Sequence, residues 1–358
     1  MSLVIAAGGT GGHVFPALAV AQVWRDRWPT VPVFWMGVRA GKERRWVEAA
    51  GFPFHGLRSG GWQPSLGWRN LRLAYRLPIA AVETSFLFSR LRPRVVFTTG
   101  GYPGLLPGFW ARLYRIPLVV LELNRYAGRT VRWLSRWATE VYGAFSQVEG
   151  ISPSVSFRWM GVPVRFSSED RSRYTSATAK AYWGFPVESP VVLVLGGSQG
   201  SSALNRAVEQ MVDAWIEAGL SVLWQVGGRE EEIRSRSIRR IAFIEDMAAA
   251  YTAADVVVSR AGGSTLGELA WWGKASILVP SPYVAEDHQR KNALYWEERG
   301  AAIVVSEEEG ETLREAVIRL AKDASLRRQY EEAARNLCRT EAAKAIAEAL
   351  YQIGYGST

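Results

Sequence analysis

Cysteine and histidine are scarce in this chain, which has one cysteine and three histidines in 358 residues. A single cysteine, Cys338, excludes an internal disulfide and a thiolate metal cluster. The sequence also lacks an Asp-x-Asp pair, and it lacks a cluster of histidines and carboxylates spaced to hold a divalent cation beside a nucleotide. We therefore expect a protein of a reducing compartment that uses no metal and no cofactor.

Long apolar runs are missing as well. No stretch reaches the ~18 apolar residues of a membrane-spanning helix. The N-terminus arrives at Gly8 before the apolar core of a signal peptide could form. The chain is therefore expected to be neither exported nor inserted into a membrane.

Acidic residues are few in the first part of the chain. Residues 1–150 contain 19 lysines and arginines against 7 aspartates and glutamates, whereas the remainder has slightly more acidic than basic residues. A basic half predicts attraction to a polyanion, which is either a nucleic acid or an anionic membrane surface. A merely solvated, arginine-rich surface is the alternative.

The pattern of apolar residues predicts an α/β fold. Short runs such as Leu3–Ala7, Val191–Leu195 and Ala242–Ile244 are apolar on both faces, as the strands of a covered parallel sheet are. Helical patterns lie between these runs, so each half of the chain is predicted to form a doubly wound, Rossmann-like domain. We expect the two domains to face a central cleft.

The length of the chain suits two domains, each large enough to bury a core of its own. We place the first domain at residues 1–163 and the second at residues 164–340. The last helical pattern, within residues 341–358, can pack back on the first domain, although periodicity does not establish that.

Three glycine-rich turns follow predicted strands. The first is Gly8-Gly9-Thr10-Gly11-Gly12-His13, and similar turns occur at Thr99–Gly104 and at Gly196–Gly200. Glycine lets the backbone approach a ligand, and the N–H groups at the start of the next helix favour an anion. The carboxyl ends of parallel strands share one edge, so these turns predict a phosphate-bearing ligand. No turn is a Walker A loop, and tight turns without a ligand are the alternative.

A second polar cluster follows the run Val256–Ser259. Thr265 and Glu268 are three residues apart and share a helical face, where a carboxylate can accept hydrogen bonds from both ribose hydroxyls. Gln289 and Asn292 share another face, and neutral amides suit the hydroxyls of a sugar. The alternatives are an ordinary surface charge at Glu268 and a solvated helix around Gln289.

These motifs, in this order and over nearly the whole chain, resemble the MurG family of bacterial glycosyltransferases. The segments that carry the resemblance are Gly8–Pro16, Gly100–Tyr102, Gly196–Gly200, Gly262–Glu268, and Asp287–Gln289 with Asn292. The resemblance implies a GT-B fold and an inverting transfer of N-acetylglucosamine (GlcNAc) from UDP-GlcNAc to undecaprenyl-diphosphate-MurNAc-pentapeptide. It also implies a peripheral location at the cytoplasmic face of the cell membrane, in peptidoglycan synthesis, cell wall biogenesis, cell shape and cell division.

The resemblance further implies roles for individual residues. Catalytic roles fall to His13, Glu122 and Asn124, and the acceptor side to Gly100, Gly101 and Tyr102. Donor binding falls to a longer set, namely Thr10, Gly11, Gly12, Asn124, Arg165, Ser198, Phe243, Ile244, Gly263, Ser264, Thr265, Glu268, Gln289 and Asn292. In that set Phe243 and Ile244 flank the uracil, Thr265 and Glu268 hold the nucleoside, Ser198 and Arg165 hold the diphosphate, and the two amides contact the sugar.

The chain departs from the family pattern at three positions. Where the family commonly has polar residues in its His-Glu-Gln-Asn and Asn-Pro-Val-Arg motifs, this chain has Leu121, Leu123 and Val162. The neighbouring Glu122 and Asn124 keep the residues of the family.

An inverting transfer needs a base beside the acceptor hydroxyl and hydrogen-bond donors beside the leaving diphosphate. His13 is the one histidine in a glycine-rich turn, so its neutral imidazole is a candidate base, with Glu122 as the rival. A histidine that caps the helix or binds phosphate is the alternative. Backbone N–H groups near Ser198 and the guanidinium of Arg165 can take the place of a metal, so we expect metal-independent catalysis.

A segment of the basic half predicts the membrane contact. If 66–76 is helical, Trp68, Leu71 and Tyr75 form one stripe with Arg72 and Arg76 beside it. Such a stripe can enter the headgroup region while the arginines meet lipid phosphates. A helix that buries its aromatic residues in the core is the alternative.

Three competing functions remain open. A related UDP-sugar transferase would make glycolipids, and a UDP-GlcNAc epimerase would share the donor cleft without a membrane patch. A nucleic-acid-binding protein would use the basic half, but the usual nucleic-acid modules are missing from the sequence. The peptide of the acceptor, the oligomeric state and the identity of the base are not fixed by the sequence.

Overall fold

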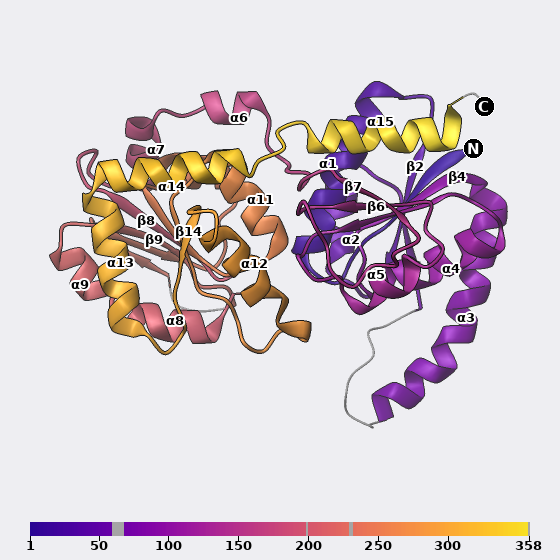
Figure 1. The fold of residues 1–358 in the computed structure, drawn as a ribbon, viewed down its shortest axis with the longest axis horizontal. Helices are drawn as coiled ribbons and strands as arrows, with labels where there is room; N and C mark the ends of the chain where they lie inside the picture. The colour runs from indigo at the N-terminus through magenta and orange to yellow at the C-terminus, as the bar shows by residue number, and fades with distance from the viewer. Residues whose placement is uncertain (59–67, 198–199, 229–231, 357–358) are drawn as a thin grey trace. The chain divides into compact units, whose positions relative to one another are not determined.

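The structure, a computed structural model, describes residues 1–58, 68–197, 200–228 and 232–356, with the backbone only for 68–76 and 285. The chain forms two compact units. Unit 1 comprises Met1–Arg165 and Arg339–Thr358, and unit 2 comprises Phe166–Cys338. Each contains a mainly parallel sheet with helices on its faces, which confirms the predicted α/β class (Figure 1).

Unit 1 has a seven-stranded sheet in the order β3-β2-β1-β4-β5-β6-β7, in which every pairing is parallel. Its strands are β1 (Ser2–Ala6), β2 (Val33–Val38), β3 (Phe54–Leu57), β4 (Pro93–Thr98), β5 (Leu118–Glu122), β6 (Glu140–Gly143) and β7 (Ser156–Trp159). Its helices are α1 (Gly11–Arg27), α2 (Glu43–Ala49), α3 (Trp68–Leu91), η1 (Tyr102–Gly104), α4 (Leu105–Leu113), α5 (Arg129–Leu134) and α15 (Ala342–Tyr355).

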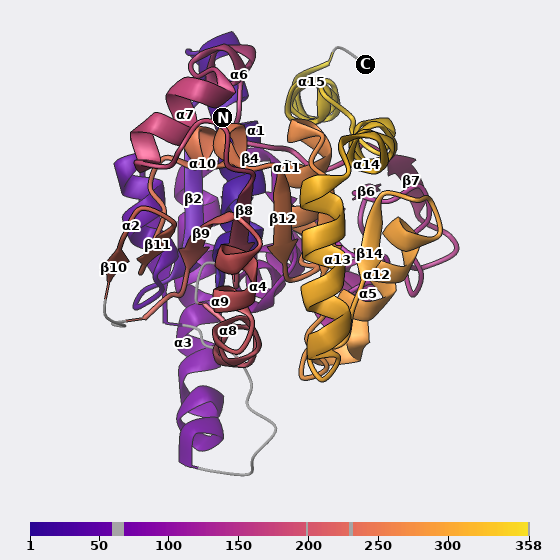
Figure 2. The same ribbon diagram turned by 90° about the vertical axis from the view of Figure 1, so that its left-hand side faces the viewer.

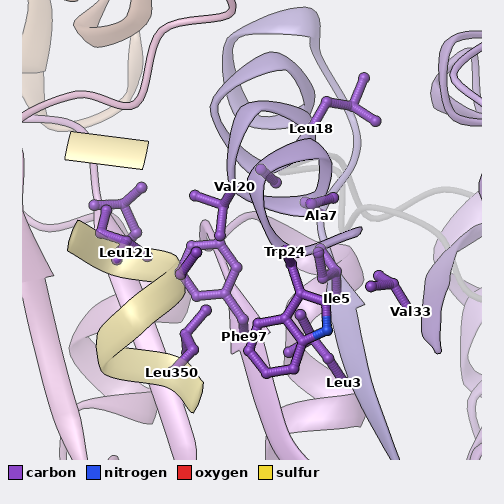
Figure 3. Close-up of a cluster of buried hydrophobic side chains, with 14 of the residues drawn as sticks. Leu3, Ile5, Ala7, Leu18, Val20, Trp24, Val33, Phe97, Leu121 and Leu350 are labelled. Carbon is purple, nitrogen blue, oxygen red and sulfur yellow. The ribbon is translucent and has the colours of Figure 1, made fainter. Parts of the chain in front are cut away.

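The sheet of unit 1 separates two apolar layers. Side chains alternate along a strand, so Leu3 and Ile5 of β1 enter one layer while Val4 enters the other. The first layer holds Trp24 of α1 together with Leu350 of α15, as Figure 3 shows. The C-terminal helix therefore completes the core of the unit that contains the N-terminus.

Unit 2 has a second seven-stranded sheet, in the order β10-β11-β9-β8-β12-β13-β14, in which only the β10 pairing is antiparallel. The strands are β8 (Val191–Leu195), β9 (Ser221–Gln225), β10 (Ile233–Arg234), β11 (Ile238–Ile241), β12 (Val256–Ser259), β13 (Ser276–Leu278) and β14 (Ala302–Val304). The first five helices are α6 (Ser168–Ser172), α7 (Ser176–Trp183), α8 (Ser202–Glu209), α9 (Val212–Glu217) and α10 (Met247–Ala253). They are followed by α11 (Gly263–Trp272), η2 (Ala285–Asp287), α12 (His288–Glu297), α13 (Gly310–Lys322) and α14 (Ala324–Asn336). Helix α13 packs across β8, β12 and β13 (Figure 2).

One predicted strand is wrong. Residues 242–244 form no strand, and the chain instead pairs Ile238–Ile241 as β11 with β9. β11 contains two arginines, so its sequence does not have the apolar pattern of a covered strand. The strand accommodates them because each guanidinium lies over an aromatic ring: Arg239 over Phe185 and Arg240 over Trp224. The apolar run Ala242–Ile244 is therefore available as a loop at the carboxyl end of β11.

Both sheets have a point where the strand order reverses. In unit 1 it lies between β1 and β4, and in unit 2 between β8 and β12. Loops that leave neighbouring strands in opposite directions at such a point open a crevice at the carboxyl edge of the sheet. The glycine-rich segments Gly8–Gly12, Gly100–Gly101, Gly196–Gly200 and Gly262–Gly263 follow these four strands. The fold thus places every predicted phosphate turn at a ligand-binding edge.

Candidate functional site

The first glycine turn connects β1 to α1. Gly9 has a φ of +90°, a conformation that favours glycine. Thr10 is the N-cap residue of α1, and its side chain makes no capping hydrogen bond. The first turn of a 17-residue helix is therefore not capped by its own N-cap hydroxyl, which suits the binding of an anion there.

A buried carboxylate, Glu43, holds this turn through hydrogen bonds to the backbone. Glu43 Oε1 accepts a hydrogen bond from the Val38 N–H at 2.9 Å, and Oε2 accepts one from the Gly9 N–H at 3.4 Å. A Cβ atom on Gly8 would lie 2.5 Å from Glu43 Oε1, so a larger residue at this position would have to displace the Glu43 carboxylate. Glu43 was not among the predicted site residues, because nothing near it in the sequence links it to the first turn.

His13 is tied to the second glycine turn. Its Nδ1 lies 2.8 Å from the Thr99 carbonyl oxygen, and the Thr99 hydroxyl donates to the His13 carbonyl at 2.9 Å. Since a carbonyl can only accept, Nδ1 carries the proton in the neutral ring and Nε2 carries the lone pair. This tautomer is the one in which Nε2 can take a proton.

The second turn continues the same cluster. Gly100 and Gly101 have φ values of +79° and +68°, and Tyr102 opens the short helix η1. A Cβ atom on Gly9 would lie 3.4 Å from the Tyr102 ring, and one on Gly101 would lie 3.8 Å from His13 Cδ2. Burial and the negative charge of Glu43 raise the pKa of Tyr102. The structure thus brings the first turn, His13 and the expected acceptor residues together within unit 1.

Glu122 holds the loop that follows β5. Its Oε1 accepts hydrogen bonds from the backbone N–H and side-chain amide of Asn124, at 2.8 and 2.9 Å, and Oε2 accepts one from the Gly128 N–H at 2.9 Å. Burial raises the pKa of Glu122, and these three donors partly offset that effect. The carboxylate therefore orients Asn124 and shapes the loop.

The three departures from the family pattern fall at apolar positions. Leu121 and Leu123 are buried in the same layer as Ile5 and Trp24, and Val162 packs against that layer. Leucine and valine there add to the core without leaving a polar group buried.

Arg165 belongs to unit 1 and lies next to the start of α1. Its guanidinium carbon is 4.7 Å from the centre of the Phe15 ring. Phe15 is in the first part of α1, so the cation is held near the first glycine turn. The second domain was expected to begin at residue 164, whereas the structure groups Arg165 with the first unit.

In unit 2, a buried amide links two predicted donor-binding segments. Gln225, at the end of β9, donates from Nε2 to the Gly197 carbonyl at 3.1 Å and accepts at Oε1 from the Ile244 N–H at 2.9 Å. Ile244 is buried, whereas Phe243 is 45% exposed. One side chain thus holds both Gly197, in the glycine-rich segment after β8, and Ile244, in the segment expected to flank uracil. Ser198 lies outside the described residues.

The turn before α11 is also held by a buried side chain. Gly262 is the N-cap residue of α11 and Gly263 its first residue, and no side chain caps the helix. Asn292 is fully buried and donates to the Ala261 carbonyl at 3.0 Å, so it fixes this turn. Gln289 accepts from the Ser281 N–H at 2.9 Å.

Arg260 is a second supporting residue that was not predicted from the sequence. It is buried, donates to the Ser201 hydroxyl and to the Val279 carbonyl, and forms an ion pair with Glu307. Ser201 in turn caps α8. Arg260 therefore joins the ends of β12 and β13 to the start of the helix that follows the Gly196–Gly200 turn.

Glu268 lies on α11, one turn after Thr265, and both side chains are half-buried. Ser264 is half-buried at the start of the same helix. The Tyr251 hydroxyl donates to Glu268 Oε2 at 2.9 Å. The predicted nucleoside residues therefore share one face of α11.

Neither a metal site nor a membrane span occurs in the parts of the chain that the structure describes. No group of three or more histidine, cysteine, aspartate or glutamate residues is placed to hold a metal there. Over the same residues, no helix has the length and apolar character that crossing a membrane requires.

The expected membrane stripe lies where side chains are not described. Trp68, Leu71, Arg72, Tyr75 and Arg76 fall in the first part of α3, which is helical in its backbone. The structure therefore gives no contacts for these five side chains.

The described remainder of α3 presents an apolar face with α4. Val82, Phe86 and Leu113 are 70%, 65% and 53% exposed. The Tyr114 hydroxyl forms hydrogen bonds with Ser85 and Ser89 at 3.0 and 3.3 Å, which tie the end of α4 to α3. Three exposed arginines lie near the ends of the same two helices, namely Arg90, Arg112 and Arg115, and we call these arginines and the exposed apolar residues the α3–α4 face.

Both the sequence and the fold are similar to those of known glycosyltransferases. Residues 3–143 match the N-terminal domain of glycosyltransferase family 28, and residues 191–350 match its C-terminal domain. A relative from Nitrosococcus oceani, named UDP-N-acetylglucosamine--N-acetylmuramyl-(pentapeptide) pyrophosphoryl-undecaprenol N-acetylglucosamine transferase, is 37% identical over 99% of both chains. The protein of that name from Salinibacter ruber is 35% identical over 96% of this chain and 95% of its own. The crystal structure of Acinetobacter baumannii MurG matches with a TM-score of 0.73 and 27% identity, over 98% of this chain and 99% of that chain.

Proposed function

Because the chain belongs to the MurG family of glycosyltransferases, we propose that it transfers GlcNAc from UDP-GlcNAc to undecaprenyl-diphosphate-MurNAc-pentapeptide in peptidoglycan synthesis. The observation that carries the proposal is the position of the family motifs. In both units the glycine-rich motifs follow the two strands between which the strand order reverses, at the carboxyl edge of the sheet. That edge is where α/β sheets bind nucleotides.

His13 is the proposed base. The acceptor hydroxyl attacks the anomeric carbon of GlcNAc and gives its proton to His13 Nε2, while the bond from that carbon to the diphosphate breaks and UDP leaves. The hydrogen bond from Nδ1 to the Thr99 carbonyl, 2.8 Å long, fixes the ring and stabilises the imidazolium that forms. Attack opposite the leaving group inverts the anomeric carbon.

The contacts of Glu122 favour a different role for this residue. Both carboxylate oxygens accept hydrogen bonds from residues of its own loop. A carboxylate used in this way organises Asn124 and Gly128, so the proton falls to His13. Asn124, whose amide donates to Glu122, is proposed to contact the transferred sugar.

Fixed donors are proposed to stabilise the leaving diphosphate. The starts of α1 and α11 supply Thr10, Gly11, Gly12, Gly263 and Ser264, and neither helix is capped by a side chain. Helix N-termini favour anions, and preorganised N–H groups stabilise charge that develops in the transition state. With Arg165 held on Phe15, these groups need no metal and no cofactor.

The remaining donor contacts are proposed within unit 2. Phe243 and Ile244 flank the uracil, Thr265 and Glu268 bind the ribose, and Gln289 contacts the sugar. Asn292 acts on the same site through Ala261, whose carbonyl it holds. Ser198 is proposed as a diphosphate ligand from the family motif alone.

We further propose that the α3–α4 face binds the anionic cytoplasmic face of the membrane, where the lipid acceptor resides. Exposed Val82, Phe86 and Leu113 can enter the headgroup region, while the arginines of this face meet lipid phosphates. The stripe from Trp68 to Arg76 continues the same helix toward its N-terminus.

A transfer assay with radiolabelled UDP-GlcNAc and the lipid acceptor tests the proposal. Label that moves into the lipid extract, and only when the acceptor is present, is the expected result. Conversion of free UDP-GlcNAc without an acceptor would identify an epimerase instead. Activity with UDP-galactose and diacylglycerol, and none with the peptidoglycan intermediate, would identify a glycolipid synthase.

A further inference from the structure

Tyr251 is a tyrosine buried in the core of unit 2. The residue lies on α10 and is completely buried. Its hydroxyl donates to Glu268 Oε2 at 2.9 Å, across 17 residues of sequence. A buried hydroxyl needs a partner, and here that partner is a carboxylate on α11, the helix that follows β12.

Aromatic contacts hold the Tyr251 ring in one place. It is stacked on Trp272, with ring centres 5.8 Å apart and planes at 24°. Phe166 meets it edge-on, with centres 6.0 Å apart and planes at 90°. The hydroxyl is therefore a fixed donor, because the ring cannot turn away without disturbing both neighbours.

A fixed donor limits how the Glu268 carboxylate can rotate. A glutamate side chain on a helix surface has several rotatable bonds, and ordering them costs entropy. A hydrogen bond from an immobile hydroxyl to Oε2 selects one orientation before any ligand arrives. Two ribose hydroxyls can be recognised together only if the carboxylate keeps such an orientation.

We propose that Tyr251 is a positioning residue that makes the donor site select ribose over 2′-deoxyribose. The inference rests on the proposed role of Glu268 as the ribose acceptor. Tyr251 does not touch the nucleotide in this proposal, and its hydroxyl acts through the hydrogen bond to Glu268. It acts by keeping Glu268 ready for both hydroxyls.

Calorimetry with UDP and 2′-deoxy-UDP on the full chain tests the proposal. The variants are Tyr251→Phe, which keeps the ring packing and removes the hydroxyl, Glu268→Gln, and the double variant. Tyr142→Phe is the matched control, because Tyr142 is an equally buried tyrosine in unit 1. Thermal unfolding of each variant checks that the fold is intact.

Tyr251→Phe should weaken UDP binding by roughly five- to tenfold and 2′-deoxy-UDP binding by a clearly smaller factor, because 2′-deoxyribose offers Glu268 only its 3′-hydroxyl. The ratio of UDP affinity to 2′-deoxy-UDP affinity should therefore fall toward the ratio measured for Glu268→Gln. The double variant should bind UDP no more weakly than Glu268→Gln alone, since both changes remove the same contact. Tyr142→Phe should keep the parental preference.

An equal loss for both nucleotides, or an additive loss in the double variant, would assign Tyr251 to core packing and overturn the inference. If Glu268→Gln keeps the parental preference, Glu268 is not the ribose acceptor, and the inference fails with it. Failure of GlcNAc transfer to the lipid, with the nucleotide preference behaving as expected, would instead overturn the acceptor assignment and leave Tyr251 in place.

Discussion

Replacement of His13 by alanine tests the proposed chemistry most directly. The His13 ring is fixed through Nδ1 on the Thr99 carbonyl, 2.8 Å away, so Nε2 is the atom that can accept the proton. A positioned base contributes about 100-fold or more to a rate. This corresponds to about 2.7 kcal/mol of transition-state stabilisation. Donor affinity should change little, because proton removal occurs only in the transition state.

The assay is single-turnover transfer at saturating UDP-GlcNAc, with UDP binding measured separately by calorimetry. His55→Ala is the matched control, since His55 is the other histidine of unit 1 and lies on β3. Glu122→Gln tests the rival base. We expect it to lower stability, because the Glu122 carboxylate accepts three hydrogen bonds from its loop.

Near-parental turnover in His13→Ala would refute the assignment and return the role of base to Glu122 or to bound water. A parallel loss of UDP affinity and rate would instead make His13 a phosphate or turn residue. The two outcomes are separable because binding and chemistry are measured on the same variant.

Three further predictions concern the leaving group, the membrane and the core of unit 2. Transfer should persist in excess EDTA, since helix N-termini and Arg165 are proposed to stabilise the diphosphate; complete loss restored by magnesium or manganese would contradict this. Joint replacement of Val82, Phe86 and Leu113 by serine should weaken cosedimentation with phosphatidylglycerol vesicles by about tenfold or more and leave UDP affinity intact. Replacement of the exposed Tyr182 and Val187 in unit 2 is the control, and it should leave vesicle binding unchanged. Burial lowers the pKa of Lys274 to about 8 from an ordinary value of 10.5, so between these pH values the folded chain binds fewer protons than the unfolded chain. The free energy of unfolding should therefore gain a contribution that rises with pH from 8 to 10.5, and urea titrations of Lys274→Met should lack it; an unchanged slope would remove Lys274 as its source.

The strands of the sheet centres could be predicted from the sequence because they are apolar on both faces. The run Val191–Leu195 coincides with β8, and Leu3–Ala7 is one residue out of step with β1. Such runs have no polar face to offer to water, so a covered sheet is their natural location. The location of the glycine turns could be predicted from these strands, since a turn that follows a parallel strand must lie at the carboxyl edge of the sheet.

The edges of the sheets could not be predicted in the same way. β11 contains Arg239 and Arg240, and only the rings of Phe185 and Trp224, which are distant in sequence, make room for those cations. Helix α3 runs from Trp68 to Leu91, beyond the end of the predicted segment at residue 76. Local periodicity reports neither effect, because both depend on neighbours from other elements.

The residues that support the site share this non-local character. Glu43 reaches Gly9, Tyr251 reaches Glu268 and Asn292 reaches Ala261, each from a different element. The glycines and polar residues that meet a ligand form recognisable motifs, whereas the side chains that hold them do not. This is why the motifs could be read from the sequence and their supports could not.

Gln225 shows what such a support is expected to do. Glycine turns are entropically costly to order, so a turn that binds phosphate must take its rigidity from a buried partner. Gln225 supplies it to both Gly197 and Ile244, and Gln225→Leu should therefore weaken UDP binding roughly tenfold, because the diphosphate and uracil segments lose their common anchor. Asn205→Leu is the matched control, since the Asn205 amide is also buried and bonds to Val226 and Trp224 at similar distances. Both variants should lose stability, which thermal unfolding measures, but only the first should lose UDP affinity. An equal loss of UDP affinity in both would show that Gln225 merely fills the core.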